Sequence, residues 1–260
     1  MIPGRVALVA ACVAFVQGLT VPGAVAGDAI GTIERVKGSI VAVGTYERTR
    51  APPFQFRGTG FVVGDGTLIA TNAHVVASQV DPARREVLGI LVPGAQPGDA
   101  QFREARQLAV DPDSDLALLA IGGAPMPAMR IGDSDGVRAG QEILFTGFPI
   151  GAVLGPYPAT HRGMVAAITP LAIPQGQARS LDPKLIRRLT AGSYPVFQLD
   201  ATAYPGNSGS PVYDVATGEV LGIVNMVFVK GTKETALTQP SGITYAIPAK
   251  HLQELMRKSR

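Results

Sequence analysis

The segment at residues 204–212 reads YPGNSGSPV and offers two candidate nucleophiles, Ser208 and Ser210. Gly, Asn, Ser and Pro also gather in ordinary turns, so this segment alone does not separate an active site from a turn. A serine hydroxyl becomes a good nucleophile only when a nearby base takes its proton. Acyl transfer to a serine also needs backbone N–H groups aimed at the oxyanion that develops on the attacked carbonyl. The rest of the chain must therefore supply a base and an orienting acid.

The chain contains three histidines, which keeps the search for a base short. His74 directly follows a predicted strand in the segment TNAHVV, a position that places its ring at the end of that strand. His161 is expected to be a structural residue at a strand entrance, and His251 a surface residue of the C-terminal helix. We therefore predict that His74 is the general base.

The acidic partner is predicted to be Asp115, in the segment VDPDSDLALLAI. Asp115 opens an apolar strand and is expected to be partly buried, whereas Asp111 and Asp113 lie in the turn around Pro112 and are expected to be solvated. A buried carboxylate can hold an imidazole in one tautomer and stabilise its protonated form. The alternative is a residue that merely ends a turn before a strand.

Ser208 is the better of the two serines because Gly206 lies two residues before it. Glycine permits unusual backbone angles that can turn an N–H group inward. The N–H groups of Gly206 and Ser208 would then form an oxyanion hole, with Asn207 between them. The chain order His74, Asp115, Ser208 matches the chymotrypsin order and differs from the orders in subtilisin and the α/β-hydrolases.

The elements that position these residues are predicted to be short strands separated by turns, a pattern typical of an all-β sandwich or barrel. The clearest hairpin turn is Gly64-Asp65-Gly66. One helical pattern is clear, at Ala249–Lys258. The predicted strands are Ser39–Val43, Gly60–Val63, Thr67–Thr71, Glu86–Val92, Gln101–Val110, Leu116–Ile121, Glu142–Thr146, Gly163–Ile168, Val196–Leu199, Pro211–Tyr213, Val220–Val229 and Ile243–Ile247.

A loop-rich stretch at 122–140 divides these strands into two comparable halves. We expect one half of the protein at 27–135, the other at 136–248, and the terminal helix at 249–260. The long insertion at 170–194 is predicted to carry a short helix at Asp182–Leu189. Loops of this length in compact domains are often functional.

Residues 1–26 have the pattern of an export signal, with Arg5, an apolar run at 6–16 and an Ala-Val-Ala triplet before Gly27. The apolar run is about half of the roughly 20 residues that span a membrane, which disfavours an anchor. A lipoprotein signal ending at Cys12 is a third alternative, with too short an apolar region before it. Cleavage before Gly27 would remove the only cysteine, and with it any thiolate nucleophile or thiolate metal site.

The composition argues for a globular protein, with 46% hydrophobic and 17% charged residues. The formal net charge of +3 is small and scattered, and no basic stripe with interleaved aromatic residues indicates nucleic-acid binding. A His-Asp-Ser site needs no metal and no cofactor, so none is expected.

The sequence resembles the trypsin-like serine proteases, and within them the HtrA (DegP/DegQ-like) group. The resemblance implies an all-β fold of two six-stranded antiparallel β-barrels, with the site between them. It also implies that His74 is the base, Asp115 its orienting acid, Ser208 the nucleophile, and Gly206, Asn207 and Ser208 the oxyanion hole. The matching segments occur in family order, at 58–63 (GTGFVV), 71–76 (TNAHVV), 115–119 (DLALL), 131–143, 147–151 (GFPIG), 198–212, 221–225 (LGIVN) and 242–248.

Three features depart from the family pattern. Ser210 stands where the usual GNSGGP motif has glycine, no PDZ domain follows residue 250, and the insertion at 170–194 is longer than expected. Asn207 occupies the position of the aspartate that pairs with a new N-terminus in zymogens, so no zymogen cleavage is expected.

Four residues are predicted to line the primary specificity pocket: Thr202, Ala203, Met226 and Tyr245. Thr202 lies where trypsin-type specificity requires an acid, which favours small or medium aliphatic side chains at the cleavage site. The expected partners are protein or peptide substrates, without nucleic acid and without stable membrane insertion after signal cleavage. A homo-oligomer is compatible with the resemblance. A non-catalytic binding module and an esterase on the same site are the alternatives to a serine endopeptidase.

Overall fold

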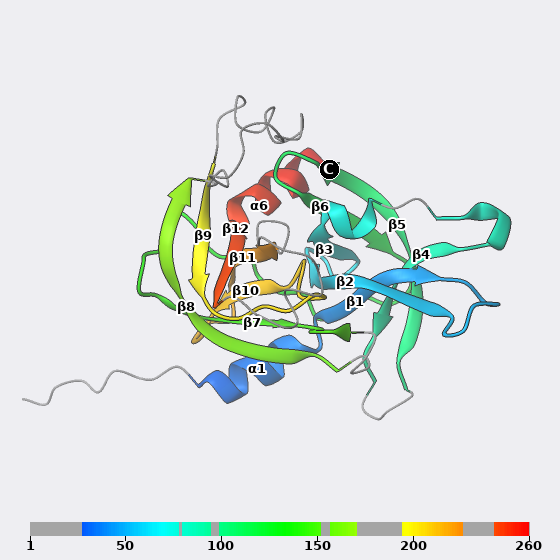
Figure 1. Ribbon diagram of the computed structural model, residues 1–260, viewed down its shortest axis with the longest axis horizontal. Helices are drawn as coiled ribbons and strands as arrows, with labels where there is room; N and C mark the ends of the chain where they lie inside the picture. Colours follow the sequence, from blue (N-terminus) through cyan, green and yellow to red (C-terminus); the bar gives the residue numbers. More distant parts are fainter. Residues whose placement is uncertain are drawn as a thin grey trace, which may run out of the picture.

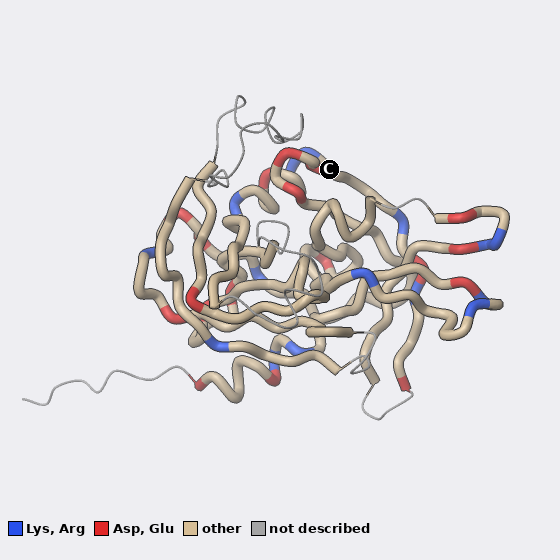
Figure 2. The backbone as a smooth tube through the Cα atoms, viewed as in Figure 1, with Lys and Arg blue, Asp and Glu red and all other residues tan. Residues whose placement is uncertain are grey.

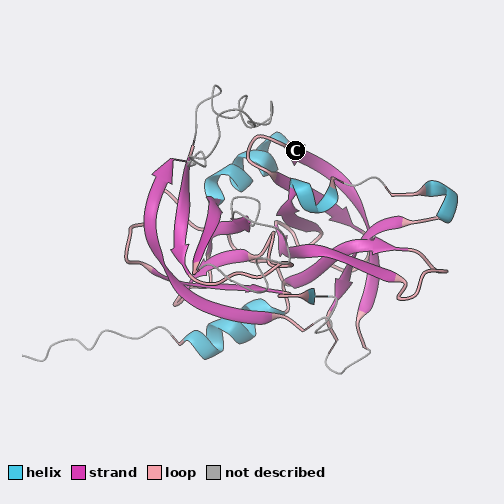
Figure 3. Cartoon of the chain, in the orientation of Figure 1, coloured by secondary structure: helices cyan, strands magenta, loops and turns pink. Residues whose placement is uncertain are grey.

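The computed structural model describes residues 28–77, 80–94, 99–151, 157–170, 194–225 and 242–259. Their strands form two closed antiparallel barrels of six strands each, which confirms the predicted fold class. The course of these strands can be followed in Figures 1 and 3. The strand order is β1-β2-β3-β6-β5-β4 in the N-terminal barrel and β10-β11-β12-β9-β8-β7 in the C-terminal barrel.

The strands of the N-terminal barrel are β1 (Ile40–Tyr46), β2 (Phe54–Val63), β3 (Leu68–Asn72), β4 (Val87–Val92), β5 (Gln101–Asp111) and β6 (Leu116–Ile121). Those of the C-terminal barrel are β7 (Glu142–Gly147), β8 (Ala159–Pro170), β9 (Pro195–Asp200), β10 (Pro211–Asp214), β11 (Val220–Asn225) and β12 (Ile243–Pro248). All twelve predicted strands overlap these elements. The largest differences are at β2 and β8, which extend beyond their predicted limits into mostly half-buried residues.

Apolar packing joins the two barrels into one body. One buried cluster fills the N-terminal barrel and another fills the C-terminal barrel. A third contains residues of both, among them Phe61 of β2, Leu118 of β6, Tyr213 of β10 and Ile247 of β12. Strands such as β6 are therefore apolar on both faces, because one face lines the barrel and the other meets the second barrel.

The predicted terminal helix is present as α6 (Ala249–Lys258), which packs on β6 and β11, one strand from each barrel. A helix that the sequence pattern did not predict, α1 (Ala29–Lys37), lies near the start of the described chain. The Asp28 side chain caps it by accepting a hydrogen bond from the backbone N–H of Gly31 at 3.1 Å. Two short helical elements are α2 (Ala73–Val76) and η1 (Pro82–Arg84).

Several predictions fall on residues outside the described ranges. They are the export signal at 1–26, the helix at Asp182–Leu189 with most of the surrounding insertion, and the last residues of the strand predicted at Val220–Val229. Within the described residues, no helix is both long and apolar enough to cross a membrane. Figure 2 shows acidic and basic residues interspersed over both barrels.

Candidate active site

His74 and Asp115 meet because two neighbouring strands end side by side. In the antiparallel pair of β3 and β6, Asn72 lies opposite Leu116. The residues just after β3 and just before β6 therefore lie at the same end of the pair, which brings α2 and its His74 next to Asp115. The His74 Nδ1 atom lies 2.6 Å from Oδ2 of Asp115, and the His74 backbone N–H donates to Oδ1 at 2.9 Å.

The backbone of Asp115 has a left-handed conformation, with φ at 55°, which Asp tolerates better than most residues. Its carbonyl oxygen accepts hydrogen bonds from the backbone N–H of Ala73 at 3.0 Å and from the Asn72 side chain at 3.1 Å. The Asp115 side chain is only 7% exposed, whereas that of His74 is 33% exposed. Hydrogen bonds thus hold both the backbone and the carboxylate of Asp115, and the imidazole of His74 keeps access to solvent.

Asn225 is a site residue that the sequence reasoning did not identify. Its side-chain Nδ2 donates to Asp115 Oδ2 at 2.8 Å, and the residue is fully buried. Asn225 ends β11 in the C-terminal barrel, so this bond crosses from one barrel to the other. The segment LGIVN predicts a strand, and nothing in it indicates a contact 110 residues earlier in the chain.

Ser208 lies in the connection between β9 and β10 of the C-terminal barrel, and β2 of the other barrel holds its backbone. The Thr59 backbone N–H donates to the Ser208 carbonyl at 2.8 Å, and the Thr59 hydroxyl donates to the Gly206 carbonyl at 2.8 Å. The φ angles of Gly206 and Gly209 are +106° and +86°, which only glycine adopts readily. The predicted need for glycine in this turn is thus explained by its backbone angles.

Donors in the serine turn fall into two sets. The N–H groups of Asn207, Gly209 and Ser210 donate to the carbonyls of Tyr204, Val224 and Asn207 at 2.9, 3.0 and 3.0 Å. Among the described residues, the N–H groups of Gly206 and Ser208 have no hydrogen-bond acceptor.

Ser208 and His74 come to the same boundary between the barrels without a direct bond. Gly58 of β2 lies close to both segments: a Cβ atom added there would lie 3.0 Å from the Ser208 carbonyl oxygen and 2.7 Å from the side chain of Val75, the neighbour of His74. No hydrogen bond joins Ser208 to His74 in the part of the chain that the structure describes. Hydrogen bonds between catalytic groups are often long without substrate and shorten in the complex.

A family model described as a trypsin-like peptidase domain matches residues 58–223. The chain belongs to the trypsin-like peptidase family. The matched range contains His74, Asp115 and Ser208.

Curated relatives of this family are DegP-like proteins. A probable periplasmic serine endoprotease DegP-like of Ectopseudomonas mendocina is 31% identical over 195 residues, which cover 75% of this chain and 33% of the relative. A protein of the same description from a Marinomonas species is 30% identical over 206 residues, which cover 77% of this chain and 36% of the relative. The chain therefore spans about a third of the length of these relatives.

Among solved structures, the HtrA-type protease AlgW with a tripeptide is 26% identical to this chain, with a TM-score of 0.61. The match covers 88% of this chain and 62% of that one. A structure of AlgW with a decapeptide gives a TM-score of 0.62 at 24% identity, and covers 89% of this chain and 67% of that one. This trypsin-like domain is thus similar in fold to HtrA-type proteases.

Three of the four predicted specificity residues lie within the described ranges, and Met226 lies outside them. Thr202 and Ala203 follow β9, and the Ala203 backbone N–H donates to the Thr244 hydroxyl of β12 at 3.1 Å. Tyr245 of β12 pairs with Asn225 of β11, the residue bonded to Asp115. The three described specificity residues thus connect the segment before the serine turn, through β12, to β11, the strand that carries Asn225.

The other two histidines lie away from Asp115. His161 of β8 stacks on Phe145 at 4.7 Å between ring centroids, and burial lowers its pKa. His251 was expected at the surface, and that expectation is wrong. Its ring lies 4.4 Å from that of Tyr194, its Nε2 atom is buried, and burial lowers its pKa. The error arose because the helix face of His251 packs on the chain that enters β9.

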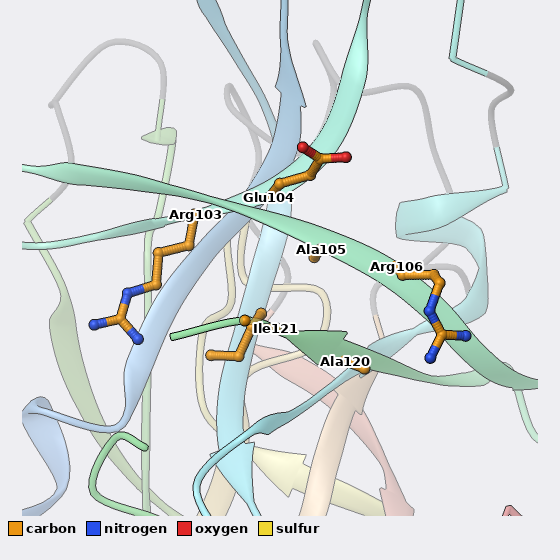
Figure 4. Close-up of a pocket in the computed structure, with 7 residues that line it drawn as sticks. Arg103, Glu104, Ala105, Arg106, Ala120 and Ile121 are labelled. Atoms are coloured by element: carbon orange, nitrogen blue, oxygen red, sulfur yellow. The ribbon is translucent and has the colours of Figure 1, made fainter. Parts of the chain in front are cut away.

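A separate hollow of about 550 Å³ lies along β5 and β6 of the N-terminal barrel (Figure 4). It is open to solvent, and its lining includes Arg103, Glu104 and Arg106 but none of the residues discussed above. Figure 4 shows the side chains of Arg103 and Arg106 pointing away from each other. Within the described residues, no group of three or more His, Cys, Asp and Glu side chains could hold a metal ion.

Proposed function

We propose that the protein is an exported serine endopeptidase that hydrolyses peptide bonds in unfolded or damaged proteins. One arrangement carries the proposal. An imidazole–carboxylate pair joined at 2.6 Å lies at the same barrel boundary as a serine turn with two N–H groups that have no acceptor among the described residues. An activated nucleophile and a ready oxyanion hole are the two requirements of acyl transfer.

In the proposed reaction, Asp115 accepts the Nδ1 proton of His74 in a hydrogen bond, which leaves the Nε2 lone pair free to act as the base. As the Ser208 Oγ attacks the substrate carbonyl carbon, its proton passes to His74 Nε2. The carbonyl oxygen becomes an oxyanion that accepts hydrogen bonds from the N–H groups of Gly206 and Ser208. His74 then protonates the leaving amine, and a water molecule hydrolyses the acyl-enzyme by the same steps in reverse.

Substrate choice is proposed to depend on Thr202, Ala203, Met226 and Tyr245. None of these residues carries an acid, so a basic side chain at the cleavage site would find no charge partner among them. Small or medium aliphatic side chains are the proposed preference. Because Asn207 is neutral, we also propose that activity does not depend on cleavage at a new N-terminus.

Export is proposed from the signal pattern at residues 1–26, with cleavage before Gly27. The relatives described as periplasmic support the same compartment. The proposed barrel halves of the mature protein are residues 27–135 and 136–248.

The deciding experiment is the degradation of unfolded casein by the mature protein, beside its Ser208→Ala variant. Degradation by the first and not by the second is expected. Equal behaviour of the two proteins would favour a binding module without catalysis. Turnover of small esters without casein cleavage would favour an esterase.

A fluorophosphonate probe tests the identity of the nucleophile. The probe is expected to label the mature protein on Ser208, with no label left after Ser208→Ala. Label on Ser210, or label that survives Ser208→Ala, would contradict the assignment.

A further inference from the structure

One side chain of β12, that of Thr244, holds the chain between β9 and the serine turn. The three residues that follow β9, Ala201–Ala203, lead into this turn, and we name them the approach segment. The Thr244 hydroxyl donates to the Ala201 carbonyl at 2.7 Å and accepts from the Ala203 backbone N–H at 3.1 Å. The Ala201 N–H donates to the carbonyl of Gly242, just before β12, at 3.1 Å. Three hydrogen bonds therefore fix the approach segment to β12 and its first flanking residue.

The Thr244 hydroxyl lies inside the C-terminal barrel, where a polar group needs a partner. Thr244 is only 1% exposed. Because side chains alternate along a strand, it shares a face with Ala246, which belongs to the buried apolar cluster of this barrel. Ala201 and Ala203 belong to the same cluster. A hydroxyl in such surroundings is destabilising unless it is hydrogen-bonded, and here both its donor and its acceptor function are used by the approach segment.

The approach segment leaves one of its three side chains accessible. Ala201 and Ala203 are 7% and 6% exposed and pack into the barrel, whereas Thr202 between them is half-buried. Thr202 has no backbone hydrogen bond of its own among the described residues. Its position therefore depends on how Thr244 holds the residue on each side of it.

We propose that Thr244 is a positioning residue for substrate selection: its hydroxyl holds Ala201 and Ala203, and thereby fixes the surface that Thr202 presents to the substrate side chain at the cleavage site. The inference rests on the proposed function and adds to the four specificity residues one that acts through two of them. An apolar pocket separates side chains that differ by one methylene by about 10–200-fold, which requires a wall that does not shift. Thr244→Val keeps the shape of the side chain and removes both hydrogen bonds.

The kinetic test measures discrimination, which a general loss of stability does not change. Peptides that differ only in Ala, Val or Leu before the cleaved bond give a ratio of kcat/KM between the best and the worst substrate. Thr244→Val is expected to narrow this ratio about three- to tenfold, and Thr244→Ser, which keeps the hydroxyl, should retain it.

Thr32→Val is the matched control for this measurement. Thr32 of α1 is also 1% exposed, and its hydroxyl donates to the Ala216 carbonyl at 3.3 Å and accepts from Arg35 at 3.0 Å. The control should keep the wild-type ratio. A wild-type ratio in Thr244→Val, or equal narrowing in Thr32→Val, would overturn the proposal.

Amide hydrogen exchange tests the hold on the approach segment without catalysis. In the Ser208→Ala background, Thr244→Val should raise the exchange rate of the Ala203 N–H at least about tenfold, whereas Thr244→Ser should leave it near the value of the parent protein. An exchange rate that Thr244→Val does not change would overturn the proposal. Because this measurement needs no turnover, a failure of the proposed peptidase activity and a failure of the Thr244 contact give separate results.

Discussion

The two barrels contribute different kinds of structure to the candidate site. The N-terminal barrel supplies His74 and Asp115, whose carboxylate accepts three hydrogen bonds, two of them from His74. The C-terminal barrel supplies the serine turn, where the N–H groups of Gly206 and Ser208 have no acceptor among the described residues. The carboxylate beside the proposed base already has its hydrogen bonds, whereas two N–H groups beside the proposed nucleophile have no acceptor among the described residues.

The largest loss of kcat is expected from substitutions of His74 and Asp115 in the N-terminal barrel. Asp115→Asn keeps the shape of the side chain but removes the charge that orients His74, and kcat should fall by at least about a thousandfold. His74→Ala should have a similar effect, measured as peptide hydrolysis. His161→Phe, which keeps the stack on Phe145, is the control and should retain activity. Full activity of His74→Ala would end the assignment of the base.

The next largest loss of kcat is expected from a substitution in the serine turn of the C-terminal barrel. A Cβ at Gly206 would meet the Phe148 carbonyl oxygen at 2.3 Å, and the φ of +106° disfavours any side chain. Gly206→Ala should therefore shift its N–H group and lower kcat by about a hundredfold. Gly140→Ala is the matched control, since Gly140 also has a positive φ but a Cβ there meets nothing within 4 Å. Equal losses in the two variants would show a general folding effect instead.

A smaller effect is expected from the bond that links the two halves. Asn225→Ala removes one donor from the Asp115 carboxylate and should lower kcat at least about tenfold, because hydrogen bonds to charged groups contribute about 1.5–3 kcal/mol. Asn225→Asp keeps the shape but places a second carboxylate beside Asp115, so its loss of activity at neutral pH should be larger. A kcat of Asn225→Asp equal to that of the wild type would show that this contact does not orient Asp115.

The smallest expected effect lies away from the site and concerns stability alone. Hydrogen bonds from Thr45, the Asp81 N–H and Arg50 lower the pKa of Glu86 from 4.5 to about 2. A lowered carboxyl pKa contributes stability above pH 4.5, which is lost as pH falls through about 2. Glu86→Gln should lower the free energy of unfolding by about 1–3 kcal/mol at pH 7, and the difference should shrink below about pH 4.5.

Urea unfolding across this pH range measures the Glu86 effect, with the exposed Glu104→Gln as control. A difference between wild type and Glu86→Gln that grows toward acid pH would contradict the assigned cause. Peptide hydrolysis at neutral pH should be the same in both proteins, because Glu86 lies on the N-terminal barrel away from His74.

Much of the fold was predictable because strand signals are local. The predicted limits of β6 and α6 are those of the structure, since each combines an apolar pattern with clear turn signals at its ends. Helix α1 was missed because its nine residues include Gly31 and several β-branched residues, which weaken a helical pattern. The surface prediction for His251 failed because a helix pattern does not say which other segment covers a given face.

The sequence by itself determined the residue types that the site needs and their order, together with the two halves of a barrel protein. It did so because glycine in a tight turn, an acid before an apolar strand and a histidine after one are local requirements. Only the tertiary structure decided that Asn225 bonds Asp115 and that Thr59 holds the serine turn. These contacts join strands of different barrels or residues far apart along the chain, so they exist only once both barrels have closed and packed against each other.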